Sequence, residues 1–275
     1  MPLVSDRCIC LRKTEYSETS QILTLFSRQH GILRAMAKGA HRKTKAGASR
    51  FDGGIDLLDA GQAVFSADES RQLQLLTDWK LEEGHLNLRN QLRPLLLALY
   101  AAELVSLLFE EHDPHPEAFD LLQQILLELP TPRLEESFLA FELDILRQAG
   151  FMPEFGACVS CAAPITEKDS VCFVPSRGGV VCRNCQTAFP DHLNLDARLL
   201  RLLQMIQAPV AGGVPRRLPK LTRHQTDPLN HLLMQHLENS LGRRPRSAYY
   251  VLPKRGVASP QRAAQFSCNS PGQGA

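Results

Sequence analysis

The sequence predicts an α+β protein in which a small five-stranded β-barrel precedes an α-helical domain with an inserted cysteine-rich ribbon. Three observations predict this fold. The first eighty of the 275 residues contain five short apolar runs, leucines recur at helical spacing from residue 81, and two Cys-x-x-Cys pairs then interrupt the helices. We therefore expect domains at residues 1–80 and 81–252, with the ribbon at about 155–190. Residues 253–275 are small, polar and proline-containing, and we expect them to be disordered.

The first eighty residues show strand patterning and no convincing helix. Short apolar runs are separated by polar or glycine-containing breaks, at residues 7–13, 21–27, 31–38, 55–66 and 73–79. Five short strands in one small domain are typical of a closed or partly open barrel such as the OB-fold. A fragment of a β-sandwich is the alternative interpretation of the same pattern.

The third predicted strand carries cations on one face. Alternation places Arg34 and Lys38, with Ile32 and Met36, on one side and small apolar residues on the other. The strand leads directly into a basic loop at residues 39–50, so strand and loop together predict an electrostatic groove. Four aromatic residues of this domain could offer surfaces for stacking on bases: Phe26, Phe51, Phe65 and Trp79. Most of them are expected in the core, and one is expected to stack.

Helical patterning begins after residue 81. Three helices are predicted before the ribbon and two after it, at residues 85–110, 116–129, 131–148, 196–207 and 227–241. The first has leucines on nearly every face, which indicates a central buried helix that Pro94 either starts or kinks. The third is expected to begin with Thr131 as N-cap and Pro132 at the first helical position.

Two cysteine pairs separated by twenty residues predict a tetrahedral zinc site with four ligands: Cys158, Cys161, Cys182 and Cys185. Residues 171–175 and 180–182 resemble the strands of a hairpin, so we expect a zinc ribbon. Four protein ligands leave no position open for water, and the metal is therefore expected to be structural. Two disulfides or free thiols are the alternative.

The remaining cysteines are expected to be small core residues or incidental: Cys8, Cys10, Cys172 and Cys268. Acidic and histidine residues also crowd at 110–115, where a solvated helix end is the favoured interpretation.

The charge distribution is uneven although the net charge is only +2. Residues 34–50 hold six basic and no acidic residues, residues 82–154 hold fourteen acidic against four basic, and residues 216–262 hold ten basic against two acidic. Such asymmetry favours a polyanion-binding face on an acidic body.

Several function classes are disfavoured. The first residues lack an apolar run, and the longest apolar stretch, at 94–109, is interrupted by Glu103 and too short to cross a bilayer. We therefore expect a cytoplasmic protein with reduced cysteines. No phosphate loop, dinucleotide fingerprint or nucleophile elbow is present, so we expect a non-enzymatic protein. The basic run predicts nucleic-acid binding instead, because phosphate neutralisation supplies most of that affinity.

Three segments carry a resemblance to a known family. They are Thr24-Leu25-Phe26-Ser27, Gly31-Ile32-Leu33 and the run Ala37-Lys38-Gly39-Ala40-His41-Arg42-Lys43. Followed by leucine-rich helices and the cysteine pairs, they make residues 1–250 resemble the RecO family of bacterial DNA repair proteins. The resemblance implies an OB-fold, binding of single- and double-stranded DNA, and annealing of complementary strands. It also implies help in loading RecA onto DNA coated by single-stranded DNA-binding protein, usually together with RecR.

The resemblance also assigns roles to residues. It implies phosphate contacts at Lys38, Arg42, Lys43 and Lys45, with Arg34 and Arg50 as neighbours, and metal ligands at the four paired cysteines. Not every member of the family keeps these cysteines, so zinc is a structural option. The basic segment at 243–246 is a further candidate for the DNA path. A zinc-ribbon protein-interaction or transcription-associated factor and a metal-dependent nuclease are the competing functional classes.

Overall fold

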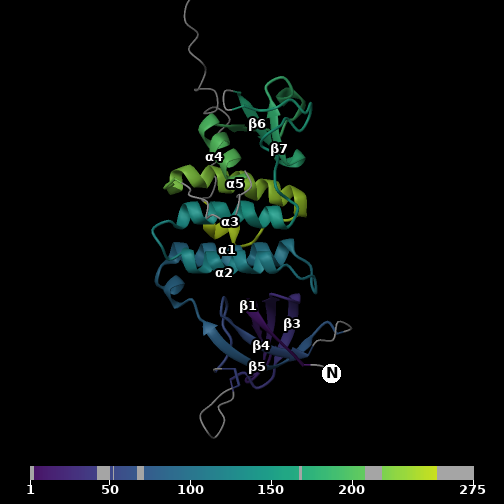
Figure 1. Cartoon of the computed structure of the whole chain (residues 1–275), viewed down its shortest axis with the longest axis vertical. Helices are drawn as coiled ribbons and strands as arrows, with labels where there is room; N and C mark the ends of the chain where they lie inside the picture. The colour runs from purple at the N-terminus through teal and green to yellow at the C-terminus, as the bar shows by residue number, and fades with distance from the viewer. Residues whose placement is uncertain are drawn as a thin grey trace, which may run out of the picture.

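The molecule is elongated, with a β-barrel at one end, helices stacked in the middle and a small sheet at the other end (Figure 1). This computed structural model describes residues 3–41, 50–51, 53–66, 71–166, 169–207 and 219–252. The predicted tail at 253–275 lies outside the described residues. The helices therefore separate the two features that the sequence singled out, the basic strand and the cysteine pairs.

The N-terminal strands form a closed barrel in the order β1-β2-β3-β5-β4. They are β1 (Leu3–Glu15), β2 (Gln21–Ser27), β3 (Gly31–Ala37), β4 (Ala60–Ser66) and β5 (Gln74–Glu83). Only β3 and β5 pair in parallel. The five-stranded barrel of the OB-fold type is thus confirmed, and the β-sandwich alternative is wrong because a sandwich would leave the sheet open.

The four aromatic residues that the sequence singled out in the barrel are all buried, whereas Tyr16, directly after β1, is 64% exposed. Phe51, Phe65 and Trp79 fill its interior, each at most 3% exposed. Phe26 points outward but packs on Phe109 and Phe119 of the helical layer, with ring centroids 6.1 and 5.7 Å away. The expectation that one of the four would stack on bases is therefore wrong, because the core and the barrel–helix junction use all of them.

The junction between the barrel and the helices is closely fitted. The Arg28 guanidinium donates two hydrogen bonds to the Asp120 carboxylate, at 2.9 and 2.8 Å. Gly31 has φ of +68°, and a Cβ built there would lie 2.3 Å from the Asp113 carbonyl oxygen. The barrel is therefore held in one position against the helical layer.

The helices largely follow the predicted ranges. They are α1 (Leu92–Leu108), α2 (Pro116–Glu128), α3 (Leu134–Gln148), α4 (Ala197–Gln207), α5 (Arg223–Leu241) and α6 (Ala248–Val251). A separate 3-10 helix, η1 (Leu86–Asn90), precedes α1, so Pro94 lies in the first turn of α1 and starts the helix without kinking it. Among the described residues, no helix is long and apolar enough to span a membrane.

Two further helix starts, those of α3 and α5, differ from the sequence prediction. Residues 131–133 form a turn in which the Thr131 hydroxyl accepts a hydrogen bond from the Arg133 N–H, so α3 begins only at Leu134. Helix α5 begins four residues earlier than predicted, because Thr222 and Gln225 form a reciprocal capping box. Pro228 lies inside α5, and packing of the helix in the core compensates for the one backbone hydrogen bond that the proline removes.

Candidate nucleic-acid interface and metal centre

The outer face of β3 carries the cations that its alternation predicted. Arg34 and Lys38 are exposed, whereas Leu33, Ala35 and Ala37 point into the barrel interior and are at most 1% exposed. The period-two prediction for this strand is confirmed. Two positive charges four residues apart thus line the approach to the basic loop.

Both ends of the basic loop are held by the barrel. At its start, His41 Nδ1 lies 3.1 Å from the Gly53 carbonyl oxygen, and His41 Nε2 lies 3.0 Å from Glu15 Oε2. At its end, the carbonyl of Arg50 accepts a hydrogen bond from the Trp79 N–H at 3.0 Å, while the Arg50 side chain is exposed. The loop therefore leaves and rejoins the barrel at two fixed points. Three of the predicted phosphate contacts lie outside the described residues: Arg42, Lys43 and Lys45.

The contacts of His41 favour its charged form. Both of its partners can only accept hydrogen bonds, so both ring nitrogens have to donate, and only the imidazolium carries two N–H groups. The hydrogen bond to Glu15 is the largest cause that raises the pKa of His41 above its ordinary value, followed by the bond to Gly53. Gly54 leaves room for the ring, since a Cβ there would lie 2.7 Å from His41 Cε1.

The raised pKa of His41 makes the loop anchor depend on pH. Its contribution is fully present below pH 6.5, the ordinary histidine value, and is lost as the pH rises through the raised pKa. We expect an NMR titration of the His41 ring to give a pKa above 6.5 in the native protein and a lower pKa in Glu15→Gln. His30 provides an internal control in the same spectra, because it does not contact Glu15. A titration of His41 that is identical in both proteins would contradict the anchor.

Arg12 is a cation on the same outer face that sequence reasoning missed. Simple alternation from the buried Cys8 and Cys10 would send its side chain into the barrel. The register of β1 against β2 shifts between Cys10 and Arg12, so Leu11 is a bulged residue and Arg12 lies opposite Thr24. No sequence signal marks this bulge, and it became visible only through strand pairing.

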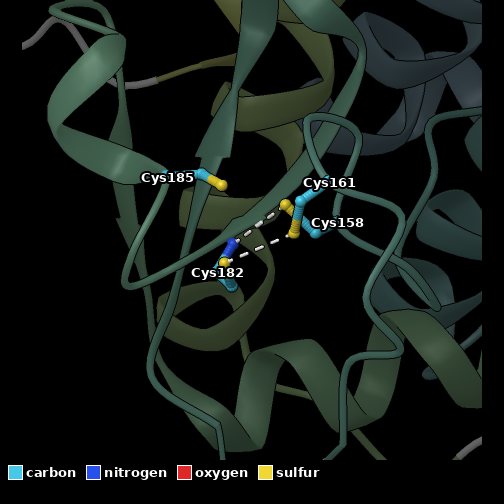
Figure 2. Close-up of side chains that lie close together, drawn as sticks. All are labelled: Cys158, Cys161, Cys182 and Cys185. Atoms are coloured by element: carbon cyan, nitrogen blue, oxygen red, sulfur yellow. Dashed lines mark hydrogen bonds between the residues drawn. The ribbon is translucent and has the colours of Figure 1, made fainter.

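The four paired cysteines come together as predicted. One sulfur from each residue lies within 4.8 Å of all the others (Figure 2). The Sγ atoms of Cys161 and Cys182 are 3.9 Å apart, which is close to the edge of about 3.8 Å for a tetrahedron with metal–sulfur bonds of about 2.3 Å. It is far longer than a disulfide bond of about 2.05 Å, and all four residues are free cysteines. The geometry fits a tetrahedral metal ion.

The backbone around the cluster supports thiolate ligands. The N–H of Cys182 donates to Cys158 Sγ at 3.4 Å. Burial by itself would raise the pKa of the Cys158 thiol, but N–H groups of Cys182, Cys161 and Ser160 aimed at its sulfur lower that pKa to about 6. At Cys158 the arrangement thus favours the deprotonated form that binds metal.

Local folding of the ribbon follows from its hairpin. Strand β6 (Val171–Val174) pairs with β7 (Gly179–Cys182), and the turn between them places Gly178 at φ of +65°. A third strand, β8 (Leu193–Leu195), pairs with the free edge of β6 and was not predicted, because three residues are too few for a recognisable alternation. The hairpin packs through Phe173 against Phe155 and against His236 of α5. The ribbon is thus attached to the helical core.

The remaining candidate residues stay outside the metal cluster. Cys8 and Cys10 are buried in the barrel, where desolvation raises the pKa of Cys10 to about 12. The single S–H of Cys172 has two acceptors within reach, Gln186 Oε1 at 3.2 Å and Asn194 Oδ1 at 3.3 Å. Cys268 lies outside the described residues.

Within the described residues, only the four paired cysteines form a group that could hold a metal, so no metal-binding cluster forms at 110–115. In the basic segment at 243–246, the Arg244 guanidinium lies 4.5 Å from the centre of the Tyr249 ring.

Comparison with known proteins covers nearly the whole of the described chain. Residues 1–85 match the family described as "Recombination protein O N terminal", and residues 89–248 match "Recombination protein O C terminal". The DNA repair protein RecO of Anaeromyxobacter dehalogenans (strain 2CP-C) is 33% identical over 239 residues, which cover 86% of this chain and 91% of the relative. That of Myxococcus xanthus (strain DK1622) is 31% identical over 252 residues, 91% of this chain and 98% of the relative.

Proposed function

This chain belongs to the RecO family of DNA repair proteins, and on that premise we propose that it binds DNA, anneals complementary strands and helps to load RecA onto single-stranded DNA. In this proposal residues 1–80 form the DNA-binding domain and residues 81–252 the helical domain that supports it. The protein acts without covalent chemistry, in the cytoplasm where the bacterial DNA lies.

The proposal depends most on one observation, the exposed pair formed by Arg34 on the outer face of β3 and Lys38 directly after that strand. Neither residue has an ion-pair or hydrogen-bond partner among the described residues. Both ends of the loop that follows are held by hydrogen bonds to barrel residues. Exposed, unpaired cations beside a cation-rich loop are suited to bind a phosphate backbone. Arg50, Arg42, Lys43 and Lys45 extend this surface in the proposal.

Annealing follows from charge neutralisation. Two complementary strands repel each other through their phosphates, and a basic surface that holds both backbones lowers that repulsion. Phe26, Phe51, Phe65 and Trp79 are buried and cannot capture bases by stacking, so the pairing edges of bases held through their backbone stay available. Specificity then comes from base pairing, with the protein reading only the backbone.

The metal is proposed to be zinc, held by Cys158, Cys161, Cys182 and Cys185. Four thiolates at tetrahedral spacing are the ligand set of structural zinc sites, and they leave no position for a substrate. The ion would hold the knuckle at residues 158–161 to the hairpin, and takes no part in strand annealing.

The partners in this proposal are DNA, RecR, single-stranded DNA-binding protein and the RecA pathway. They follow from membership of the family. A protein-interaction or transcription-associated role remains the alternative, in which the basic loop would dock a protein and bare oligonucleotide would not bind.

The salt dependence of oligonucleotide binding tests the function. If six phosphates are contacted, the slope of log affinity against log salt should be about −4, because each contact to a single strand contributes roughly 0.7. Fluorescence anisotropy with a labelled oligonucleotide gives the slope, and a parallel assay without nucleotide cofactor measures the rate at which complementary strands pair. A slope near zero, or no acceleration of pairing, would contradict the proposal.

A further inference from the structure

A cleft opens between the outer face of the barrel and the end of α1. Its volume is about 490 Å³, and its walls include Arg12, Thr24, Arg34, Ser106, Phe109 and Glu111. Figure 1 shows the barrel strands facing the helical layer to which α1 belongs. A volume of this size suits a small ligand or a single nucleotide unit, and a duplex is too wide to enter.

Strand pairing sets two arginines in one row across the barrel. Arg12 on β1 lies opposite Thr24 on β2, and Thr24 lies opposite Arg34 on β3. Neighbouring strands are about 4.8 Å apart, so the backbones of Arg12 and Arg34 are about 10 Å apart with the Thr24 hydroxyl between them. The bulge at Leu11 creates this row. Without it, Arg12 would lie opposite Leu23, whose side chain fills the barrel interior.

Neither guanidinium is used by the fold. Among the described residues, Arg12 and Arg34 have no side-chain hydrogen bond or ion pair, and both are exposed. Other arginines at the barrel–helix junction are paired, such as Arg28 with Asp120 and Arg89 with Asp56. Two unpaired guanidiniums that line one cleft are suited to bind an oxyanion, because each can donate hydrogen bonds to it.

The opposite wall of the cleft is electrostatically negative. Glu111 and the last turn of α1, at the negative end of the helix dipole, face the two arginines. An anion is therefore favoured only on the barrel side. The row also leads toward the basic loop, because Lys38 comes four residues after Arg34, directly beyond the end of β3.

We propose that this cleft seats one phosphodiester group of a single DNA strand between Arg12 and Arg34, so that the strand runs from the basic loop into the seam between barrel and helices. This inference rests on the proposed function and adds to it a site, a residue and a preference for single strands. A linear phosphate chain fits the continuous row of cations better than an acidic peptide does.

Arg12→Gln tests the site against a matched control. Lys80→Gln removes one exposed, unpaired cation from β5 of the same barrel, where it lies opposite Gln62 and lines no part of the cleft. We expect Arg12→Gln to weaken binding of a labelled oligothymidylate about fivefold, the upper range for one exposed ion pair, and to reduce the salt slope by roughly 0.7. Binding of a blunt duplex should stay within about twofold, as should both affinities of Lys80→Gln.

A second variant blocks the cleft without changing charge. Ser106 is exposed on α1, and Ser106→Trp is expected to weaken single-strand binding, whereas Leu127→Trp on the exposed face of α2 is not. Circular dichroism and thermal unfolding establish that each variant is folded.

The outcomes separate this inference from the function on which it rests. If the native protein binds no oligonucleotide, both fail. If it binds, but Arg12→Gln behaves like Lys80→Gln or Ser106→Trp binds normally, only the cleft assignment is overturned. An acidic peptide that binds the native protein and not Arg12→Gln, with oligonucleotide affinity unchanged, would assign the cleft to a peptide and also overturn it.

Discussion

Reversing four charges at the basic loop should abolish oligonucleotide binding. In the variant Lys38→Glu, Arg42→Glu, Lys43→Glu and Lys45→Glu, four attractive phosphate contacts become repulsive. At up to about 1 kcal/mol for each lost exposed contact, affinity should fall on the order of a thousandfold. The fold should persist, because Lys38 is exposed and has no partner among the described residues. Anisotropy with a single-stranded oligonucleotide in dilute buffer measures the loss.

A control variant with the same change in net charge makes this result specific. Lys80, Arg183, Arg198 and Lys220 are all exposed, and three of them lie beyond the barrel, in the ribbon and the helical layers. Reversing these four should lower affinity far less, since they do not border the proposed strand path. Equal losses in the two variants would mean that only net charge matters. Unchanged binding in the loop variant would favour the protein-docking alternative.

Removing one ligand of the cysteine cluster should release the metal and unfold the ribbon. Metal binding contributes about 10 kcal/mol or more in small zinc domains, so Cys158→Ser or Cys185→Ser should lower the thermal midpoint by on the order of 10 °C. Metal content after denaturation, read with a chromogenic chelator, should fall from about one ion per chain to none. Oligonucleotide binding should largely persist, because the ribbon and the barrel lie at opposite ends of the molecule (Figure 1).

Cys172→Ser is the matched control for the cluster. Cys172 lies in the same hairpin, but its sulfur bonds to Gln186 and Asn194 and takes no part in the cluster, and serine keeps a donor there. This variant should retain its metal. Retention of metal by Cys158→Ser, or loss of it from Cys172→Ser, would contradict the assignment. Loss of DNA binding by a folded Cys158→Ser variant would show that the ribbon itself touches DNA.

Much of the fold could be predicted because its signals are local. The alternation in β3 assigned Arg34 and Lys38 to the outer face, and the spacing of the cysteine pairs brought four sulfurs to one point. Both predictions need only neighbouring residues, since a strand alternates by its own geometry and a Cys-x-x-Cys knuckle positions its own two thiols.

Other features depend on which surfaces meet, and these the sequence left open. Phe26 alternates like an exposed residue of β2, yet it packs on the helical layer with the ring of Phe119. The charge pattern placed Glu142 among the residues of an acidic surface, yet its side chain is fully buried in α3. There it accepts a hydrogen bond from the Tyr100 hydroxyl, and burial raises the pKa of Glu142 to about 8. Both environments come from residues far away in the chain.

The amino-acid sequence by itself determined the order of barrel, helices and ribbon, the cationic face of β3 and the four clustered cysteines. Only the tertiary structure decided that Phe26, Phe51, Phe65 and Trp79 are unavailable to bases, that His41 holds the start of the loop, and that a bulge turns Arg12 outward beside Arg34. The physical reason is that periodicity and short spacings act within one segment, whereas burial, register and clefts arise from contacts between segments that the chain brings together only when it folds.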